Sequence, residues 1–246
     1  MLSKAQNKYI RSLTQQKYRN EYKVFTAEGD KIAIEWLKSN HRIQMIVATA
    51  DWADSYDHLI EQHKEALLHI VEEYELAAIS SLQTANHVLL VVPMLQQGSV
   101  NDINEWCIAT DNIQDPGNMG TIIRIADWFG IKHVVCSPGS VDVYNPKVVQ
   151  AAMGGHLRVN LYETELLPFL TPSSLPVFAA TLGGESIYKI ERPGAGILVI
   201  GNESKGISDE IIDIATYKVT IPRMGGAESL NAGVSAGILC ALLVGG

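Results

Sequence analysis

The first half of the chain alternates apolar, strand-like runs with segments whose apolar positions recur at helical spacing. Residues 1–20 place cations among apolar positions and predict a basic helix. Along the chain this is followed by a predicted strand at 22–29, a helix at 31–39, a strand at 44–49, an acidic amphipathic helix at 56–73 and a strand at 87–94. This alternation predicts a small α/β unit of about 90 residues.

The second half repeats the alternation. Strands are predicted at 106–111, 133–137, 158–163, 177–182, 196–202 and 218–222, and helices at 119–129, 145–153, 209–216 and 229–244. Because apolar strands separated by helices are typical of α/β sheets, we expect a largely parallel sheet covered on both faces. The polar stretch 94–105 is the predicted linker, with the boundary near residue 100.

The composition indicates an ordinary globular protein of one large domain or two smaller ones. The 246 residues are 47% hydrophobic and 19% charged, which excludes a disordered chain, a collagen-like repeat and a coiled coil. The three cysteines are widely spaced and form no CxxC pair, so we expect buried, reduced thiols. The first ten residues lack the apolar segment of a signal peptide, and the apolar run at 230–246 is Gly-rich and too short to span a membrane. We therefore expect a cytoplasmic protein whose last helix is a buried core helix.

The charge is acidic overall but unevenly distributed. There are 19 basic and 27 acidic residues, a formal net charge of −8. Residues 1–50 carry nine Lys/Arg against four Asp/Glu, whereas residues 51–110 carry one Lys against ten acids. A polyanionic partner is therefore expected only for the N-terminal stretch and for local patches. A solvated helix face and a phosphate-contacting arm remain alternative interpretations of residues 1–20.

Three segments of the second half combine the end of an apolar strand with Gly, Asn, Pro, Ser and a charge, and ligands bind beyond the carboxyl ends of strands in open α/β sheets. In the first, 111–130, a Pro-Gly-Asn-x-Gly turn leads into a helix expected to start near Met119. Asn118 has the residue type of a helix N-cap, and Arg124 falls on the second turn. A Gly-rich turn beside a helix N-terminus suits an anionic group, although Arg124 is also compatible with a solvated helical arginine.

The other two segments are 198–208 and 219–243. Glu203 follows a buried strand between glycines, which permits close backbone approach to a ligand; the alternative is a turn carboxylate that accepts backbone N–H groups. Ser229 or a neighbour is expected to cap an apolar helix, and the Gly-Gly-Ala loop before it leaves backbone groups available for an adenine or a ribose. Plain helix capping is the alternative interpretation of this third segment.

Several classes of site lack their signatures. The sequence contains no GxGxxG after a strand, no GxxxxGK[ST] and no HExxH, and the seven histidines do not cluster at metal-ligand spacing. A classical dinucleotide fold, a Walker-type phosphate loop and a metal site are therefore not expected. A nucleotide-dependent oxidoreductase has no supporting motif.

Taken together, DNIQDPGNMGTIIRIA, GNESKGIS and IPRMGGAESLNAGVSAG resemble, in this order, the three motifs of the SpoU/TrmH-type family of RNA ribose 2′-O-methyltransferases. The resemblance covers residues from about 105 to 246. It implies an α/β protein whose domain 104–246 is a knotted, parallel-sheet SPOUT domain. Residues 1–98 resemble the smaller, L30e-like RNA substrate-binding domain of the family, with Arg19, Glu28 and Gly29 at matching places and a basic N-terminal arm.

The resemblance also implies the site residues, an S-adenosylmethionine cofactor, a homodimer and no metal. The residues that match the catalytic positions of the motifs are Asn118, Arg124, Glu203, Ser229 and Asn231. Those that match the cofactor-lining positions are Leu182, Gly183, Gly201, Ile221, Leu230 and Asn231. The chain departs from the family pattern at Ser204, where the family usually has Gly, and at Arg223, where it usually has Met. It also has Ala232 and Gly233 where a Val-Ser pair is common.

The resemblance implies methylation of a ribose 2′-oxygen in structured RNA. Ribosomal RNA is the expected substrate and transfer RNA the alternative. A non-catalytic RNA-binding protein or ribosome assembly factor on the same fold is a further alternative, against which the five matching polar residues argue.

Overall fold

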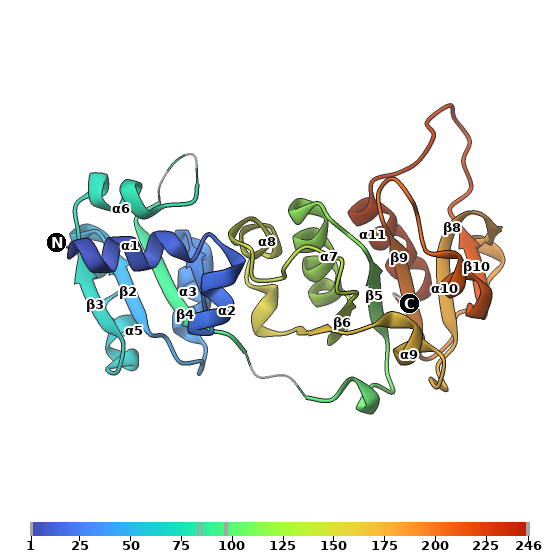
Figure 1. Cartoon of the computed structure of the whole chain (residues 1–246), viewed down its shortest axis with the longest axis horizontal. Helices are drawn as coiled ribbons and strands as arrows, with labels where there is room; N and C mark the ends of the chain where they lie inside the picture. The colour runs from blue at the N-terminus through green and yellow to red at the C-terminus, as the bar shows by residue number, and fades with distance from the viewer. Residues whose placement is uncertain (1, 83, 85, 96–97, 245–246) are drawn as a thin grey trace. The chain divides into compact units, whose positions relative to one another are not determined.

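The protein is described by a computed structural model that covers residues 2–82, 84, 86–95 and 98–244 (Figure 1). Its contacts divide the chain into two compact units. Unit 1 comprises Met1–Gln96 together with Asp142–Leu157, and unit 2 comprises Gln97–Val141 together with Arg158–Gly246. No helix among the described residues is long and apolar enough to cross a membrane.

Unit 1 is built on a four-stranded mixed sheet with the strand order β1-β4-β2-β3. The strands are β1 (Val24–Glu28), β2 (Met45–Ala48), β3 (Leu67–Ile70) and β4 (Val88–Pro93). β4 runs antiparallel to both β1 and β2, and β2 runs parallel to β3. The carboxyl ends of β1, β2 and β3 therefore lie at the same edge of the sheet as the start of β4.

Helices cover both faces of this sheet. Alternate strand residues point to opposite faces, and both faces carry apolar side chains that must be covered. On one face Val24, Met45 and Val47 pack with residues of the helices α1 (Lys4–Ser12) and α6 (Glu73–Ile79). On the other face Phe25 and Ile46 pack with Trp36 of α3 (Asp30–Lys38) and with Val149 of α8 (Pro146–Ala152). The remaining helical segments are α2 (Gln16–Tyr22), α4 (Ala50–Ser55), α5 (Asp57–Ile60), η1 (Glu61–His63) and η3 (Gly155–Leu157).

The segment 142–157 lies in the sequence between the two parts of unit 2 but packs in unit 1. The guanidinium of Arg19, only 1% exposed, donates to Asp142 Oδ2 from Nε at 2.9 Å and from a terminal nitrogen, and also to the Leu13 carbonyl at 2.8 Å. The Tyr144 ring lies 4.7 Å from the Phe25 ring, centroid to centroid. Continuity along the sequence thus assigns this segment to the C-terminal half, whereas its contacts group it with the N-terminal half. The division into a substrate-binding domain (1–98) and a methyltransferase domain (104–246) therefore remains a prediction.

Two sequence predictions for unit 1 were wrong. The helix expected over 56–73 is in fact α5, η1 and the edge strand β3. β3 was missed because its apolar and polar residues do not alternate as they do in a half-buried strand. Its apolar residues Leu67, Leu68 and Ile70 are instead 57%, 44% and 41% exposed. The single helix expected over 1–20 is two helices, α1 and α2, separated at Leu13–Gln15.

Unit 2 contains a six-stranded, fully parallel sheet with the strand order β10-β8-β9-β5-β6-β7. Its strands are β5 (Cys107–Asp111), β6 (His133–Cys136), β7 (Asn160–Glu163), β8 (Val177–Ser186), β9 (Ile197–Gly201) and β10 (Tyr217–Thr220). The central strands β5 and β9 are almost wholly buried, which is why they stand out in the sequence as continuous apolar runs. The expected parallel sheet covered on both faces is confirmed.

The helices of unit 2 are α7 (Pro116–Trp128), α9 (Leu166–Leu170), α10 (Asp209–Ile214) and α11 (Ala232–Leu243), with short turns η2 (Val100–Asp102) and η4 (Ile187–Lys189). α9 and α10 pack on the face that presents Cys107, Ala109 and Val199. α7 and α11 pack against each other, and α11 also contacts β9. The sequence prediction missed α9, whose five residues are too few to show a helical period.

All three cysteines are free and buried, as expected. Burial raises the pKa of the Cys136 thiol and of the Cys240 thiol to about 12, and it also raises the pKa of Cys107. A thiol that stays protonated near neutral pH is a poor nucleophile. The cysteines therefore belong to the hydrophobic core and not to a reactive site.

Candidate functional site

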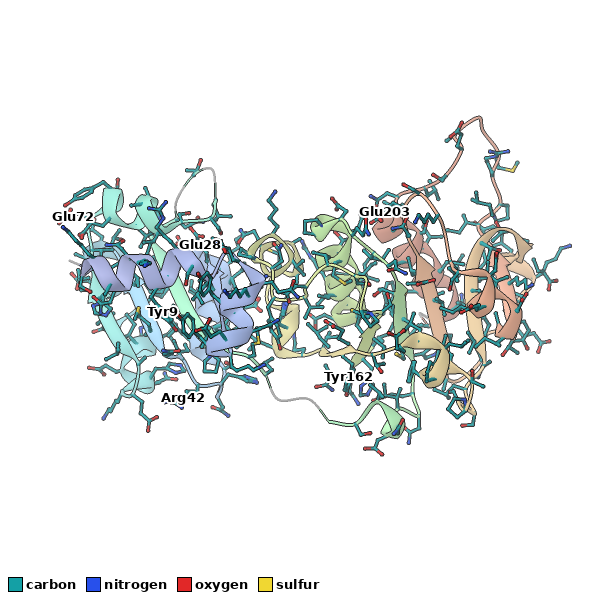
Figure 2. All side chains as sticks on the ribbon, viewed as in Figure 1. Tyr9, Glu28, Arg42, Glu72, Tyr162 and Glu203 are labelled. Atoms are coloured by element: carbon teal, nitrogen blue, oxygen red, sulfur yellow. The ribbon has the colours of Figure 1, made fainter. Side chains whose placement is uncertain are left out.

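The three motif segments of unit 2 meet at the carboxyl edge of its parallel sheet. β5 and β9 are hydrogen-bonded neighbours whose last paired residues are Asp111 and Gly201. The loops that follow these two strands therefore begin side by side. Figure 2 labels Glu203, which lies in the loop after β9, near the N-terminal end of α11.

Asn118 is the centre of a hydrogen-bonded chain that joins all three segments. Its Nδ2 donates to Glu203 Oε1 at 2.8 Å, and its Oδ1 accepts from Asn231 Nδ2 at 2.7 Å. The Asn118 side chain is buried, with the residue 7% exposed. Three of the five predicted catalytic residues are thus brought together although 85 and 113 positions separate Asn118 from its two partners.

Asn118 is not the N-cap of α7, so the alternative interpretation based on its residue type was wrong. Asp115 is the N-cap: its Oδ1 accepts from the Asn118 backbone N–H at 2.8 Å, and Pro116 occupies the first helical turn. The helix therefore starts three residues before the predicted Met119. Because Asp115 satisfies the helix end, the Asn118 amide is available to bridge the other two loops. Glu203 Oε1 also lies 3.4 Å from the Asp115 backbone N–H, so the carboxylate sits at the positive end of α7.

The Asn231 side chain caps α11 and also bonds to Asn118. It is the N-cap of α11, since its Oδ1 accepts from the Val234 N–H at 3.2 Å, while its Nδ2 donates to Asn118. α11 approaches α7 closely: a Cβ placed on Gly233 would lie 2.8 Å from Thr121 Cγ2. The expectation that α11 is buried holds for its inner side, whereas Val234 is 51% exposed.

Three residues that the sequence analysis missed hold the Glu203 loop against the end of β5. Asn202 Oδ1 accepts from the backbone N–H of Ser204 at 2.9 Å, and Asn202 Nδ2 donates to the Asn112 carbonyl at 2.7 Å. Asp111, buried, accepts from the Ser208 N–H at 2.8 Å through Oδ2. The available signal was an Asn directly after each strand, in the Asp-Asn and Gly-Asn pairs. Asn112 adopts a φ of 56°, a backbone conformation that Asn tolerates better than most residues.

Arg124 and Ser229 are not drawn into this network. Arg124 is on the exposed side of α7, and Ser229 is exposed in the loop between β10 and α11. Among the described residues neither side chain has a hydrogen bond or ion pair to Asn118, Glu203 or Asn231. As an exposed cation, Arg124 is available to an anionic group from outside the chain.

The predicted cofactor residues lie on or after β8, β9 and β10, which are adjacent in the sheet. Leu182 and Gly183 lie within β8, beyond the residues that pair with β9. Gly201 ends β9, and the other three follow β10. The Leu182 carbonyl accepts from Thr220 Oγ1 at 3.3 Å, which links Leu182 to the end of β10, directly before Ile221. A Cβ on Gly201 would lie 2.3 Å from the Gly206 backbone, so only Gly fits there, whereas Gly183 has open space around it. Leu182 and Leu230 are 78% and 49% exposed. The C-terminal part of β8 and the loops after β9 and β10 therefore offer accessible backbone and unburied apolar side chains, a combination that suits a nucleoside.

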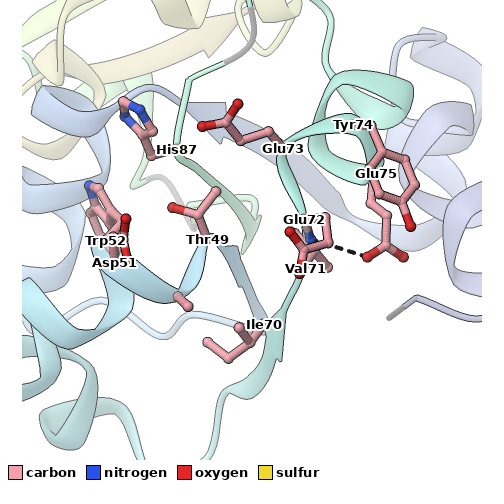
Figure 3. Close-up of a pocket in the computed structure, with 11 residues that line it drawn as sticks. Thr49, Asp51, Trp52, Ile70, Val71, Glu72, Glu73, Tyr74, Glu75 and His87 are labelled. Atoms are coloured by element: carbon pink, nitrogen blue, oxygen red, sulfur yellow. Dashed lines mark hydrogen bonds between the residues drawn. The ribbon is translucent and has the colours of Figure 1, made fainter.

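Unit 1 contains a separate pocket of about 770 Å³, which Figure 3 shows. Its lining includes Asp51, Glu72, Glu73 and Glu75 together with the aromatic side chains of Trp52 and Tyr74 and with His87. None of the predicted site residues lines it. Its carboxylates make it unsuitable for a phosphate group. Among the described residues no group of His, Cys, Asp and Glu has a geometry that could hold a metal ion.

Comparisons with protein families match both halves of the chain. The model of the SpoU rRNA methylase family matches residues 105–241, more than half of the chain. The model of the MRM3-like substrate binding domain matches residues 4–90.

Individual relatives match nearly the whole chain. A 23S rRNA (guanosine-2′-O)-methyltransferase, RlmP, of Bacillus subtilis is 27% identical over 93% of this chain and 92% of its own length. A solved structure from Porphyromonas gingivalis, described as an RNA methyltransferase of the TrmH family, is 36% identical with a TM-score of 0.89, covering 99% of this chain and 98% of that chain. The AdoMet-bound structure of an rRNA methyltransferase from Sinorhizobium meliloti is 26% identical with a TM-score of 0.87, covering 99% and 95%.

Proposed function

The chain belongs to the SpoU rRNA methylase family, and on this basis we propose that it transfers a methyl group from S-adenosylmethionine to the 2′-oxygen of a ribose in ribosomal RNA. The observation that carries the proposal is the hydrogen-bonded chain Glu203–Asn118–Asn231, which joins the three motifs at one edge of the sheet. The names of the relatives support both the chemistry and the substrate: RlmP acts on the 2′-oxygen of a guanosine in 23S rRNA. Transfer RNA is the alternative substrate.

The C-terminal part of β8 and the loops after β9 and β10 fit S-adenosylmethionine. Leu182 and Leu230 present exposed apolar side chains that an adenosyl group would cover, and Gly183 leaves space beside them. Gly201, Ile221 and Asn231 complete the proposed lining. The AdoMet-bound relative from Sinorhizobium meliloti, which matches over 99% of this chain, supports the assignment.

When bound, S-adenosylmethionine supplies a methyl group on a sulfonium, already activated for in-line attack by the 2′-oxygen. The protein's task is then alignment of the reactants and help with loss of the hydroxyl proton; alignment alone can contribute roughly 7–11 kcal/mol. We assign to Arg124 the binding of an RNA phosphate and the stabilisation of negative charge that develops on the 2′-oxygen. Glu203, Ser229 and Asn231 position the ribose and Arg124, and Asn118 fixes the geometry of the other two motifs.

We further propose a trefoil knot in unit 2, a homodimer and a cytoplasmic location. Trp128 on α7 and Val234 on α11 are 82% and 51% exposed, and a second copy of the chain that packs on these helices would cover them. In such a dimer Arg124 would serve the partner's site. Light scattering at micromolar concentration measures the assembly directly, and a monomer would contradict the dimer. Buried, reduced cysteines are consistent with a reducing compartment.

The decisive experiment is transfer of radiolabelled methyl groups from S-adenosylmethionine to purified ribosomal RNA, to ribosomal subunits and, in parallel, to transfer RNA. The expected result is label in ribosomal RNA, mapped to a 2′-O-methyl nucleotide. Label only in transfer RNA would select the alternative substrate. No label in any pool, with no binding of S-adenosylmethionine by calorimetry, would refute the methyltransferase proposal and leave the non-catalytic RNA-binding interpretation.

A further inference from the structure

Three tyrosines of unit 1 form an aromatic cluster at the protein surface. The Tyr22 ring lies between two others: its centroid is 5.2 Å from that of Tyr9 and 6.2 Å from that of Tyr18. The planes of Tyr18 and Tyr22 are nearly parallel, at 16°. Tyr9 also contacts the core beneath α1, whereas Tyr22 is 42% exposed. Tyr18 and Tyr22 lie one helical turn apart on α2. Tyr18 is half-buried, so Tyr22 presents most of the aromatic surface of the cluster to solvent.

The surroundings of this cluster are cationic. Lys17 Nζ lies 5.6 Å from the centre of the Tyr18 ring. On α1, Lys4, Lys8 and Arg11 are exposed and recur at intervals of four and three residues, which places them in one stripe along the helix. The Tyr9–Tyr22 contact holds α2 against α1. Tyr9 directly follows Lys8, about 100° further around the helix, so the rings lie beside the cationic stripe and not on it. Glu21 is the only acidic residue between positions 2 and 23.

The opposite electrostatic character is found elsewhere in the same unit. Residues 51–79 carry eight acidic residues and one lysine, and they include the carboxylates of the pocket in Figure 3. Tyr74, at this pocket, is 68% exposed. Figure 2 labels Tyr9 and Glu72 at different places on the unit, although α1 packs against α6, the helix that follows Glu72. Unit 1 therefore has exposed tyrosine on a basic surface and exposed tyrosine on an acidic surface, and only the former suits a polyanion.

We propose that Tyr18 and Tyr22 form a stacking platform for an unpaired base of the RNA substrate, with the cations of α1 holding the adjacent phosphates. The proposal rests on the proposed function, since it takes RNA as the substrate. Sequence-tolerant stacking of bases on aromatic rings beside a basic track is a general mode of binding single-stranded nucleic acid, and RNA loops expose unstacked bases. The platform thus selects an unpaired segment of the RNA over a paired one, while the carboxylates of the acidic pocket repel its phosphates.

The test measures affinity by fluorescence anisotropy for two RNA probes: a stem-loop with an unpaired loop, and a fully paired duplex of the same length. Wild-type protein is compared with Y22A, Y18A and Y22F, and Y74A is the matched control on the acidic surface. We expect Y22A and Y18A to bind the stem-loop about tenfold more weakly while their affinity for the duplex changes little. Y22F keeps the ring and should match the wild type, and so should Y74A.

Two results would overturn the platform. One is a Y22A protein, with an unchanged thermal midpoint, that binds the stem-loop as tightly as the wild type. The other is an equal loss in Y22F and Y22A, which would assign the contact to the phenol hydroxyl instead of the ring. A loop that carries 2-aminopurine gives an independent readout, since stacking quenches its fluorescence and the quench should vanish in Y22A.

Because these assays need neither cofactor nor turnover, they separate the platform from the chemistry. Loop-selective binding without methyl transfer would leave the platform standing and remove the proposed function. Methyl transfer with no loss of loop affinity in Y22A and Y18A would support the proposed function and refute the platform.

Discussion

The two units hold their candidate functional groups in opposite ways. In unit 2, Asn118, Glu203 and Asn231 are tied to one another by hydrogen bonds of 2.7–2.8 Å, and the loop that carries Glu203 is tied to the end of β5. In unit 1, the cations of α1 and the ring of Tyr22 are exposed, and among the described residues no hydrogen bond joins them to one another. Catalysis requires a fixed geometry, whereas binding of a polyanion requires charge and accessible surface. Substitutions should therefore change turnover in unit 2 and affinity in unit 1.

The largest effect is expected at Arg124. Replacing it by Ala should lower the rate of methyl transfer by about 10²–10³-fold, because a cation that stabilises developing negative charge is lost. S-adenosylmethionine binding, measured by calorimetry, should change little. Arg192→Ala removes an exposed arginine of the same unit outside the three motif segments and serves as the control. Near-normal turnover of Arg124→Ala would contradict the assignment.

The second effect is expected in unit 1, where lowering the pH should decrease the free energy of unfolding. His156 is 1% exposed; burial lowers the pKa of its imidazole to about 4, from an ordinary value of 6.5, despite a 2.8 Å contact from Nε2 to the Val143 carbonyl and the nearby Asp142. The unfolded chain therefore takes up a proton at a pH where the folded chain does not. Stability is full above about pH 6.5 and falls as the pH decreases towards 4, by up to about 3 kcal/mol.

Hydrogen exchange of the β1 and α8 amides checks this prediction. Protection in the wild type should decrease between pH 7 and pH 5. A His156→Gln variant retains an amide that can donate to Val143 but does not titrate, so its protection should depend less on pH. Parallel pH profiles for the two proteins would show that His156 is not the group responsible.

The sequence predicted unit 2 better than unit 1 for a physical reason. Buried central strands such as β5 and β9 are continuous apolar runs, and each was predicted within a residue or two of its bounds. β3 lies at the edge of its sheet with its apolar side chains exposed, so its pattern resembles neither an alternating strand nor a buried one. Local periodicity reports burial, and it fails where burial is incomplete.

The site shows a second limit. Residue type alone suggested a cap at Asn118, but Asp115 has the same capping chemistry and precedes a Pro, which is the stronger signal for a helix start. The bridge from Asn118 to Glu203 and Asn231 joins positions far apart in the sequence, and no spacing rule predicts such pairs. The family resemblance placed these residues in one site, and the structure shows the hydrogen bonds that connect them. The supporting roles of Asp111, Asn112 and Asn202 depend on the same three-dimensional arrangement.

The network in unit 2 should show coupled substitutions of intermediate size. Asn118→Ala and Glu203→Ala both break the 2.8 Å bond between these side chains, so the second substitution should cost less in the background of the first. We expect a coupling energy of about 0.5–3 kcal/mol in the rate of methyl transfer. A double-mutant cycle on turnover measures it. Strictly additive effects would show that the hydrogen bond does not matter to the reaction.

The smallest expected effect is on the salt dependence of RNA binding, and it distinguishes RNA binding by unit 1 from catalysis by unit 2. Replacing Lys4, Lys8 and Arg11 by Ala removes the cationic stripe of α1, which we expect to contact phosphates. For single-stranded RNA the slope of log K against log salt should become shallower by about 0.7 for each cation that contacts a phosphate. Lys31, Lys38 and Arg42, outside α1, provide a matched triple substitution of equal charge. Because the stripe lies outside the hydrogen-bonded network of unit 2, turnover at saturating RNA should stay near the wild-type rate. An unchanged salt slope would assign residues 1–20 to a solvated helix face, and a lower saturated turnover would show that the division between recognition and chemistry does not follow the two units.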